Sequence, residues 1–456
     1  MATVSVAYDI PIDREAGVLV IGGGSSGIAA STAAARLGVK TVLIERLGFL
    51  GGTSTAGLVG PFMTGWSADG KQQIIAGIFQ EIIDRMVAMG GAIDPSKTHA
   101  GTAHASFIDY GHAHVTPFHA ETLKLAALEM LDEAGVEMRF HTSLVDAIKC
   151  DGRIESLVLL DKSGLRAVPA KVVIDASADG DVAARAGAEF TVGRPDGKMM
   201  PATMFFRVGG IDDARVEAWM NEHQRLHPGE RLFECLVQRA KTEGKWSVPR
   251  EYVNMYREPR AGEYRVNTTR LHGVDGTDPQ QLSRAEVEGR RQVAQVMRFL
   301  REYCAGCEHS QLLETASQIG IRETRHIVGK YVLTGDDVIL GRKFPDVIAR
   351  CAYPIDIHDP TGTRGTLRGP QESGQNWYEI PYRCLMPPRV VNLLVAGRCI
   401  SATHEGAASA RVIPACYATG QAAGTAAAIA ARRGIRPRDI AIGELQDTLR
   451  GARAIL

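Results

Sequence analysis

The N-terminal segment contains the feature that most restricts the fold of this chain. Residues 17–21 form a continuous apolar run, which is typical of a strand buried on both faces of a parallel sheet. A glycine-rich turn occupies residues 22–27, and the alanine-rich residues 26–37 are predicted to form a helix. We expect Gly38 to end this helix and residues 39–45 to form the next strand. This order predicts a βαβ unit.

The turn of this unit fits the pattern G-x-G-x-x-G, and an acidic residue ends the second strand. Gly22 permits a tight turn, Gly24 lets the backbone approach a pyrophosphate, and Gly27 permits close packing of helix on sheet. The helix N terminus supplies amides and partial positive charge for phosphates. Glu45 is placed to accept hydrogen bonds from ribose hydroxyls. The motif predicts a bound dinucleotide but does not separate NAD from FAD.

Composition narrows the function classes. The 456 residues exceed the roughly 250–300 residues at which a single core stops growing, so we expect two domains. Hydrophobic residues make up 45% and charged residues 23% of the chain, which argues against disorder. Lys and Arg together number 52, as do Asp and Glu, so the formal net charge is zero. This balance disfavours a protein that acts mainly on nucleic acid or on an anionic membrane.

The start of the chain has no basic segment followed by an apolar one, so we expect no signal peptide. No apolar run reaches the roughly 18 residues of a membrane helix. We therefore expect a cytoplasmic protein whose eight cysteines stay free thiols. Only Cys304 and Cys307 have motif spacing. Without a second such pair or neighbouring histidines, they are interpreted as structural.

The pattern of the remaining chain predicts a discontinuous domain. Helices are predicted over residues 74–89, 121–134 and 283–303, and residues 90–118 are predicted to be an irregular, substrate-facing loop. Strands are predicted over 137–140, 144–149, 153–160, 166–169, 171–176, 202–208, 263–269 and 393–396. An alanine-rich helix follows the last strand. We assign residues 1–60, 116–195 and 385–456 to a nucleotide-binding domain, 196–384 to a substrate domain, and 61–115 to an insertion near the cofactor.

Six segments in order along the chain resemble a known family: IGGGSSGIAAS, ERLGFLGGTST, VIDASADGDVA, QIGIRETR, NLLVAGRCIS and ATGQAAGTAAA. They are similar to the FAD-dependent oxidoreductases of the glutathione-reductase-like superfamily. More narrowly, they resemble the branch related to the flavoproteins of succinate dehydrogenase and fumarate reductase. The resemblance covers nearly the whole chain. It implies an α/β fold, with a Rossmann-like FAD-binding domain and an inserted α+β substrate domain.

The resemblance also implies roles for individual residues. Those assigned to the cofactor are Gly22, Gly24, Ser26, Gly27, Glu45, Arg46, Gly51, Gly52, Thr53, Ser54, Asp179, Gly397, Arg398 and Ala415. The helix beginning near Pro414 is expected to point its N terminus at the flavin pyrimidine edge, which gains negative charge on reduction. In succinate dehydrogenase a histidine of the flavin loop binds FAD covalently. Residues 51–55 contain no histidine, so we expect noncovalent FAD.

Polar residues that follow these motifs are candidates for the substrate site. Oxidation of an alcohol or amine needs a hydride acceptor and a base for the second proton. His404 is the first candidate for the base, and Arg322 and Arg411 are candidates for binding a carboxylate. Two alternatives stay open: Arg322 to Arg325 could form a structural ion-pair cluster between the domains, and His404 could bind only flavin or backbone.

The sequence is compatible with more than one function. The leading one is an enzyme that oxidises or reduces a small polar metabolite; oxygen, a quinone or another protein could each reoxidise its flavin, and the chain could form a homo-oligomer. An aromatic monooxygenase is less favoured because a Gly-Asp-Ala motif is replaced by Ala396-Gly397-Arg398. An RNA-modifying protein is disfavoured by the zero net charge. The histidines of the irregular loop are interpreted as solvated side chains rather than metal ligands: His104, His112, His114 and His119.

Overall fold

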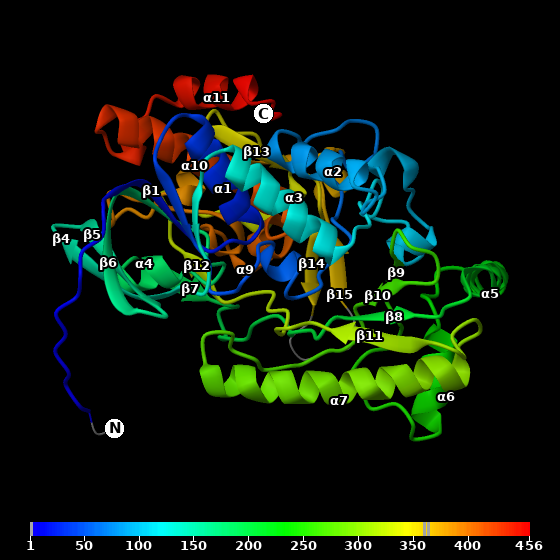
Figure 1. Cartoon of the computed structure of the whole chain (residues 1–456). Helices are drawn as coiled ribbons and strands as arrows, with labels where there is room; N and C mark the ends of the chain where they lie inside the picture. The colour runs from blue at the N-terminus through cyan, green and yellow to red at the C-terminus, as the bar shows by residue number, and fades with distance from the viewer. Residues whose placement is uncertain (1–2, 359–361, 363–364) are drawn as a thin grey trace.

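The computed structural model describes residues 3–358, 362 and 365–456. A mainly parallel sheet forms its upper part in Figure 1, with strand order β3-β2-β1-β6-β5-β4 and with β17 beside β6. The strands of this sheet are β1 (Ala16–Ile21), β2 (Thr41–Ile44), β3 (Glu137–Arg139), β4 (Ser143–Cys150), β5 (Arg153–Asp161), β6 (Gly164–Asp175) and β17 (Leu393–Val395). The predicted α/β fold is confirmed.

The helices packed around this sheet include the one that opens the βαβ unit. They are α1 (Ser25–Arg36), α2 (Ile78–Ala88), α3 (Ala120–Glu133), α4 (Asp181–Arg185), α9 (His404–Ala410), α10 (Ile413–Arg433) and α11 (Ile442–Gly451). The predicted helix over 74–89 begins only at Ile78. Gly77 before it has a left-handed φ of 64°, and the amides of Ile74 and Ile75 bond to the Gly65 carbonyl oxygen instead.

The two strands predicted over 166–169 and 171–176 are one continuous strand, β6. Its first half pairs antiparallel with β5, with Pro169 opposite Ser156, and forms the predicted hairpin. From Ala170 onward it pairs parallel with β1, and its last residues also pair with β17. The strand therefore changes partners where the prediction placed a break.

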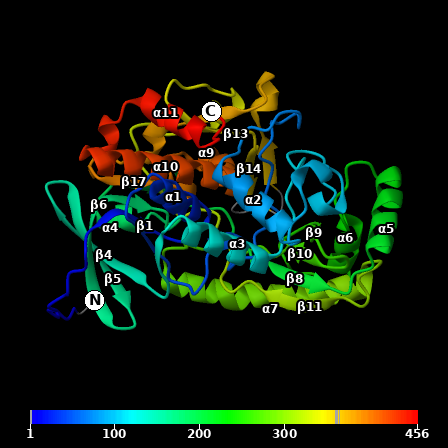
Figure 2. The same ribbon diagram turned by 45° about the horizontal axis from the view of Figure 1, so that its top comes forward.

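Helices α1 and α10 lie side by side although they are far apart in the sequence (Figures 1 and 2). Both are rich in alanine. A Cβ added at Gly420 would overlap the backbone of Ser26, and one added at Gly424 would overlap the backbone of Ala30. Small residues at four-residue spacing thus let the two helices approach closely. This contact ties the C-terminal segment to the βαβ unit.

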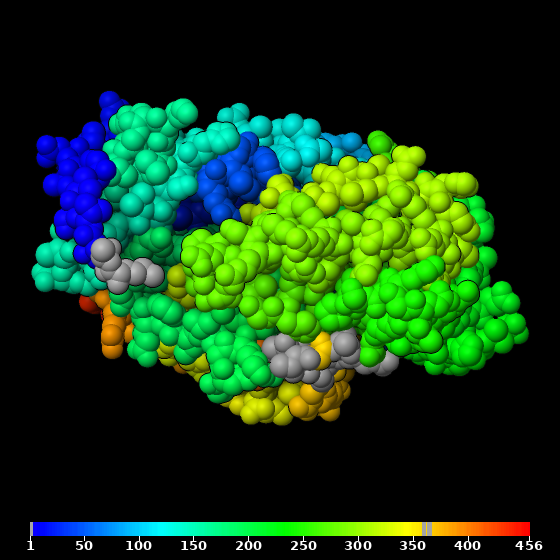
Figure 3. All heavy atoms as spheres, turned by 90° about the horizontal axis from the view of Figure 1, so that it is seen from below, coloured from blue at the N-terminus to red at the C-terminus, as the bar shows by residue number. Residues whose placement is uncertain are grey.

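The lower part of the molecule is built on an antiparallel sheet of order β11-β8-β10-β9. Its elements are β8 (Phe206–Gly209), α5 (Asp213–Leu226), α6 (Glu234–Thr242), β9 (Met255–Arg257), β10 (Tyr264–Val266), α7 (Pro279–Tyr303) and β11 (Gln311–Thr315). The strands predicted over 202–208 and 263–269 are thus shorter than expected. Viewed from below, α7 and its neighbours cover most of that face (Figure 3).

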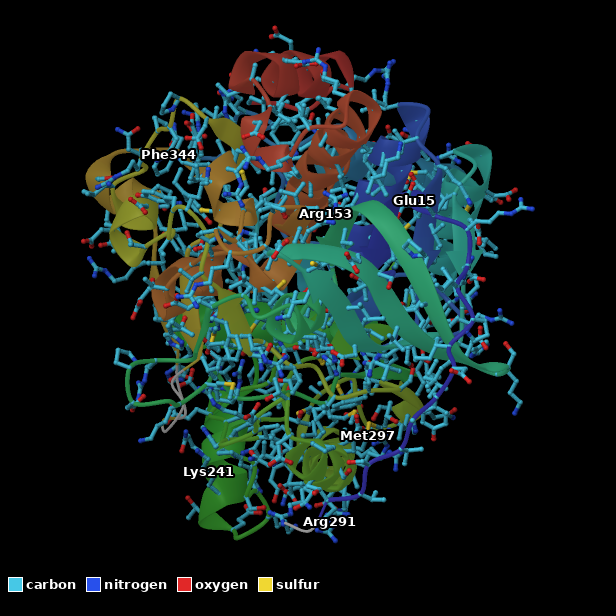
Figure 4. The ribbon with its side chains drawn as sticks, turned by 90° about the vertical axis from the view of Figure 1, so that its left-hand side faces the viewer. Glu15, Arg153, Lys241, Arg291, Met297 and Phe344 are labelled. Carbon is cyan, nitrogen blue, oxygen red and sulfur yellow. The ribbon has the colours of Figure 1, made fainter. Side chains whose placement is uncertain are left out.

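Helix α7 begins at Pro279, earlier than predicted, because the Asp278 side chain accepts hydrogen bonds from the amides of Gln280 and Gln281. Val293, Val296, Met297 and Leu300 recur at helical spacing and are buried. Burial of each such side chain contributes about 1.5–3 kcal/mol. In Figure 4, Arg291 of the same helix lies at the lower edge of the molecule, away from Met297.

Segment 325–381 contributes several short elements. They are β12 (Arg325–Ile327), which pairs with β7 (Phe190–Val192), and α8 (Gly335–Ile339), β13 (Val347–Cys351), β14 (Ile355–His358), β15 (Gly365–Arg368) and β16 (Tyr378–Pro381). Buried residues from Ile327 to Leu385 join the apolar cluster of the upper sheet, whereas those from Ala202 to Ile319 form a second cluster. Figure 4 likewise shows Phe344 in the upper part, with Glu15 and Arg153, and Lys241 in the lower part. The domain limits given above stay a prediction.

Among the described residues, no helix combines the length and the apolar character that crossing a membrane requires.

Candidate active site

A cavity of about 710 Å³ lies between the two parts of the molecule. This volume is within the roughly 300–1,000 Å³ of small-molecule sites. On one side its lining comes from the βαβ turn, the carboxyl ends of β2 and β6, and the start of α10. On the other side it comes from the region of β9 and β10 and from residues 318–322. The cavity thus begins at the ends of parallel strands, where α/β proteins bind ligands.

The glycines of the first turn have the close contacts that the motif predicts. Gly22 has a left-handed φ of 103°, and its amide donates to the Ile44 carbonyl oxygen at 2.8 Å. A Cβ added at Gly27 would overlap the Gly22 carbonyl oxygen. A Cβ added at Gly52 would lie 2.8 Å from the Cα of Gly24, so two backbone segments meet here without side chains. They form a narrow cradle at the N terminus of α1.

Backbone amides hold Glu45 at the edge of this cradle. Its Oε2 accepts from the Gly23 amide at 2.7 Å, and its Oε1 accepts from the Leu47 amide at 2.8 Å. The side chain is buried and lines the cavity. The adjacent Arg46 reaches across the cavity, and its Nη2 donates to Oε1 of Gln318 at 2.5 Å.

The second and third predicted motifs meet beside the first. Asp179 follows β6, and Arg398 follows β17, which pairs with β6. Nη2 of Arg398 donates to Oδ1 of Asp179 at 2.6 Å, and Thr324 Oγ1 donates to the same oxygen at 2.7 Å. Nη1 of Arg398 is buried without a hydrogen-bond partner among the described residues. A phosphate or a flavin oxygen would satisfy such a donor.

The structure divides the predicted cofactor residues into two groups. Those that line the cavity are Gly22, Gly24, Ser26, Glu45, Arg46, Gly52, Thr53, Asp179 and Arg398. The others lie outside its lining and support it: Gly27, Gly51, Ser54, Gly397 and Ala415. Gly397, for example, has a φ of 81°, and a Cβ there would lie 2.6 Å from Oγ of Ser26.

Helix α10 starts at the cavity, as predicted. Val412 and Ile413 line the cavity and Pro414 occupies the first turn, where its missing N–H costs nothing. Among the described residues, no side chain caps this N terminus. Its amides and its partial positive charge are therefore available to a ligand.

Arginines gather at another region of the cavity. Nη1 of Arg322 donates to the Pro201 carbonyl oxygen and to Thr203 Oγ1, at 2.5 and 2.6 Å, and its Nη2 donates to Asn267 Oδ1 at 3.3 Å. Burial, and then the charges of Arg411 and Arg250, lower the pKa of Arg322 to about 9. Arg322 and Arg411, the two predicted substrate anchors, therefore lie in one cluster.

Two further arginines belong to this cluster and were not predicted. Arg231 and Arg250 lie 5.0 and 4.7 Å from the ring centroid of Tyr252, and all three residues line the cavity. Nη2 of Arg411 lies 3.9 Å from Oδ2 of Asp356. Asp356 belongs to strand β14.

His404 does not line the cavity. It is buried, and its Nδ1 lies 2.8 Å from Oε1 of Glu323. The same oxygen lies 2.8 Å from Nε2 of His326. Burial opposes ionisation of Glu323, but the hydrogen bonds to His326 and His404 outweigh it and lower its pKa to about 2. A catalytic role for His404 stays a prediction.

The segment from Arg322 to Arg325 has features of both roles considered for it above, the binding of a substrate and a structural ion-pair cluster. Arg322 faces the cavity, whereas Glu323 bonds to buried histidines. Nη1 of Arg325 donates to the Asp179 carbonyl oxygen at 2.9 Å and to Asp181 Oδ1 at 3.1 Å. One residue of the segment thus lines the cavity, and its neighbours join the two parts of the molecule.

The interpretation of the loop histidines as solvated is wrong for His112. This side chain is 6% exposed and lines the cavity, together with Tyr256 and Tyr353. The only sequence signal for it was the prediction that residues 90–118 face the substrate. His119 lies beside Glu258 and Glu263 in a group that could hold a metal ion, but arginines already pair with both carboxylates.

The family of the chain is clear from its sequence. A family model described as FAD dependent oxidoreductase matches residues 17–449. No curated protein matches the chain.

Several solved structures are similar over most of their length. One is a geranylgeranyl bacteriochlorophyll reductase-like protein from Thermoplasma acidophilum, with 13% identity, coverage of 98% of this chain and 85% of that chain, and a TM-score of 0.46. Another is p-nitrophenol 4-monooxygenase from Pseudomonas putida DLL-E4, with 12% identity, coverage of 96% of this chain and 84% of that chain, and a TM-score of 0.47. A third is L-proline dehydrogenase from P. horikoshii, with 11% identity, coverage of 93% of this chain and 95% of that chain, and a TM-score of 0.44. Likeness at this level carries no information about the substrate.

The residues of the cavity fit the family's cofactor. The glycine cradle and the uncapped starts of α1 and α10 suit phosphates and an electron-rich flavin edge, and Glu45 suits a ribose. FAD is the cofactor, and the protein is an oxidoreductase. The chain belongs to the family of FAD dependent oxidoreductases.

Proposed function

We propose that this oxidoreductase transfers a hydride between FAD and a small polar metabolite that carries a carboxylate. When bound, FAD supplies a two-electron acceptor at its N5 position. The observation that carries the proposal is the partly buried Arg322, which lines the same cavity as the cofactor residues and lies near Arg411 and Arg250.

The chemistry of Arg322 favours an anionic ligand. Its three hydrogen-bond acceptors, at Pro201, Thr203 and Asn267, are neutral oxygens. Removing a cation from water is costly, and the neighbouring Arg411, Arg250 and Arg270 increase that cost for Arg322 more than the single carboxylate of Asp356 reduces it. A carboxylate accepts two parallel hydrogen bonds from a guanidinium and would offset the cost. Arg322 and Arg411 would then hold the substrate, and Asp356 would orient Arg411.

The finer family assignment is part of the same proposal. We infer that the chain belongs to the branch related to the succinate dehydrogenase and fumarate reductase flavoproteins, on the six motifs described above. We also infer that FAD is bound noncovalently, because residues 51–55 of the flavin loop contain no histidine. Acid precipitation of the purified protein should then release all of the flavin into the supernatant.

The function is tested by mixing the yellow holoenzyme anaerobically with pairs of acids and amides. Lactate with lactamide, and malate with malamide, differ only in the charge that the arginines would recognise. We expect one of the acids, or a related hydroxy or amino acid, to bleach the flavin at far lower concentration than its amide. Equal bleaching by the amides would contradict the carboxylate site. Reduction by NADPH alone would favour the monooxygenase alternative.

A further inference from the structure

His112 is the one histidine among the described residues that line the cavity. It comes from the irregular loop before α3, is buried from solvent, and lines the cavity together with Arg322 and Arg411. Its ring stacks nearly parallel to Tyr256, with centroids 6.2 Å apart, and its centroid lies 6.5 Å from that of Tyr353.

The hydrogen bond of one ring nitrogen determines the tautomer of His112. Nδ1 lies 2.9 Å from the carbonyl oxygen of Tyr110. A carbonyl oxygen only accepts hydrogen bonds, so Nδ1 carries the proton. In the neutral ring Nε2 is then left with a lone pair. Burial lowers the pKa of His112 to about 4, so the ring is neutral at pH 7.

A short chain of contacts connects His112 with the arginine cluster. Its neighbour Tyr353 donates its hydroxyl to Oδ2 of Asp356 at 3.4 Å, and that oxygen lies 3.9 Å from Nη2 of Arg411. The charged groups that act on His112 are Arg231, which disfavours its protonation, and Asp356, which favours it. His112 is therefore connected through Tyr353 and Asp356 to Arg411, which lines the same cavity.

Three other titratable groups of the lining are poorly suited to accept a proton. Burial raises the pKa of Tyr256 and Cys416 to about 12 and that of Tyr353 well above its usual value, so all three keep their protons. Oδ1 of Asp179 is already engaged by hydrogen bonds from Arg398 and Thr324. His404 lies outside the lining and its Nδ1 is engaged by Glu323.

We propose that Nε2 of His112 is the catalytic base of this site; the proposal rests on the proposed function, oxidation of a carboxylate-bearing substrate by FAD. In the oxidation of a hydroxy acid, the O–H bond breaks and its proton passes to Nε2. The electron pair of that bond forms the C=O double bond, and the C–H bond gives its hydride to FAD, which is reduced by two electrons. The same balance holds for an amine, with an N–H bond and a C=N product.

The bound substrate assists this step. Its carboxylate adds a negative charge near His112, and a nearby negative charge raises the pKa of a histidine. The ring would therefore become a better proton acceptor when the substrate is in place. The Tyr110 carbonyl oxygen, which accepts from Nδ1, would stabilise the imidazolium that forms.

The test compares two histidines of the same loop. His112→Asn keeps an N–H donor near the Nδ1 position but removes the Nε2 base. His104→Asn is the matched control, because His104 also bonds through Nδ1 to a backbone carbonyl oxygen at 2.9 Å and does not line the cavity. Both variants are prepared as holoenzymes, and FAD content and melting temperature show whether they fold.

The rate of flavin reduction by the most active acid of the panel is measured by anaerobic stopped flow. We expect His112→Asn to lower the rate about 100-fold or more, the range of general base catalysis, and His104→Asn to leave it within about twofold. Oxalate, which has no C–H bond to oxidise, serves as a binding probe, and its affinity should stay within about threefold in both variants. An unchanged reduction rate in folded His112→Asn overturns the proposal.

A second measurement does not depend on turnover. In holoenzyme with 15N-labelled histidine, the signals lost in His112→Asn identify the ring of His112. We expect shifts of a neutral ring with its proton on Nδ1 at pH 7, and a change of the Nε2 signal on addition of oxalate. A proton on Nε2, or a charged ring, overturns the proposal. If no acid bleaches the wild-type flavin, the proposed function is wrong, and the proposed role of His112 is then wrong as well.

Discussion

The two regions of the cavity are built in different ways. The nucleotide region is made mostly of backbone, namely the glycine turn, the uncapped starts of α1 and α10, and the ends of β1, β6 and β17, with a few side chains such as Glu45 and Arg398 beside it. The arginine region is made of side chains, supplied by segments as far apart as His112, Arg250, Arg322 and Arg411. A backbone site tolerates few residue types, whereas a side-chain site can change its ligand by substitution. The first region therefore reports the cofactor, and the second is the proposed substrate region.

The largest effect is expected from a substitution that disrupts only the nucleotide region. In Gly27→Ala the added Cβ overlaps the Gly22 carbonyl oxygen, so α1 must move away from the turn. We expect about 1,000-fold weaker FAD binding or loss of the folded protein, measured as the FAD-to-protein ratio after gel filtration. Gly443→Ala is the control, since a Cβ there meets open space, and its FAD content should equal that of the wild type. Full FAD content in Gly27→Ala would contradict the account.

The next largest effect is expected from a substitution that alters the arginine region and leaves the nucleotide region intact. Arg322→Met removes the positive charge but keeps a long side chain, so we expect oxalate binding to weaken about 100-fold or more while FAD content stays unchanged. Arg291→Met, on the exposed side of α7, should change neither quantity (Figure 4). Oxalate affinity is measured from the perturbation of the flavin absorption spectrum. Equal affinity in Arg322→Met would remove the basis of the proposed function.

A smaller effect concerns the layer that joins the two regions. The folded-state pKa of Glu323 is about 2, below the roughly 4.3 of an unfolded glutamate, so it stabilises the fold above pH 4.3 and loses this effect as the pH falls toward 2. The shift corresponds to about 3 kcal/mol. We expect Glu323→Gln to lower the free energy of unfolding by a similar amount at pH 7, and the gap to the wild type to narrow between pH 5 and pH 3. Denaturant titrations at each pH measure the gap, and a gap independent of pH would be inconsistent with this role.

The smallest effect marks the limit of the substrate region. His404→Asn keeps a donor to Glu323, and His404 lies outside the cavity lining. We expect flavin reduction to fall by no more than about threefold, with a lower melting temperature as the main change. A loss as large as that expected for His112→Asn would return the catalytic role to His404.

The difference between the regions also explains what the sequence could predict. The parallel sheet and the cofactor turn follow from local patterns, because each glycine of the motif stands where a side chain would clash with nearby backbone, as at Gly22 and Gly27. The family resemblance added Asp179 and Arg398, which follow strands of one sheet. The reasoning from local patterns misplaced the break in β6, because a change of strand partners leaves no local mark around Pro169.

The substrate region could be predicted only in part. The resemblance led to Arg322 and Arg411, but not to Arg231 or Arg250, which lie in segments without any recognisable motif. Nothing local distinguishes His112 from the other histidines of its loop. Its burial depends on contacts with Tyr256 and Tyr353, which are more than 140 residues away in the chain. Long-range packing of this kind is beyond the reach of pattern and propensity.

The central claim is that one cavity binds FAD through backbone at one region and an anion through arginines at the other. A crystal structure of the holoenzyme with oxalate tests it most directly. The account predicts the FAD pyrophosphate at the amides that follow Gly24, and oxalate within hydrogen-bond distance of Arg322 and Arg411. Oxalate bound away from both arginines, or a pyrophosphate bound away from the glycine turn, would contradict it.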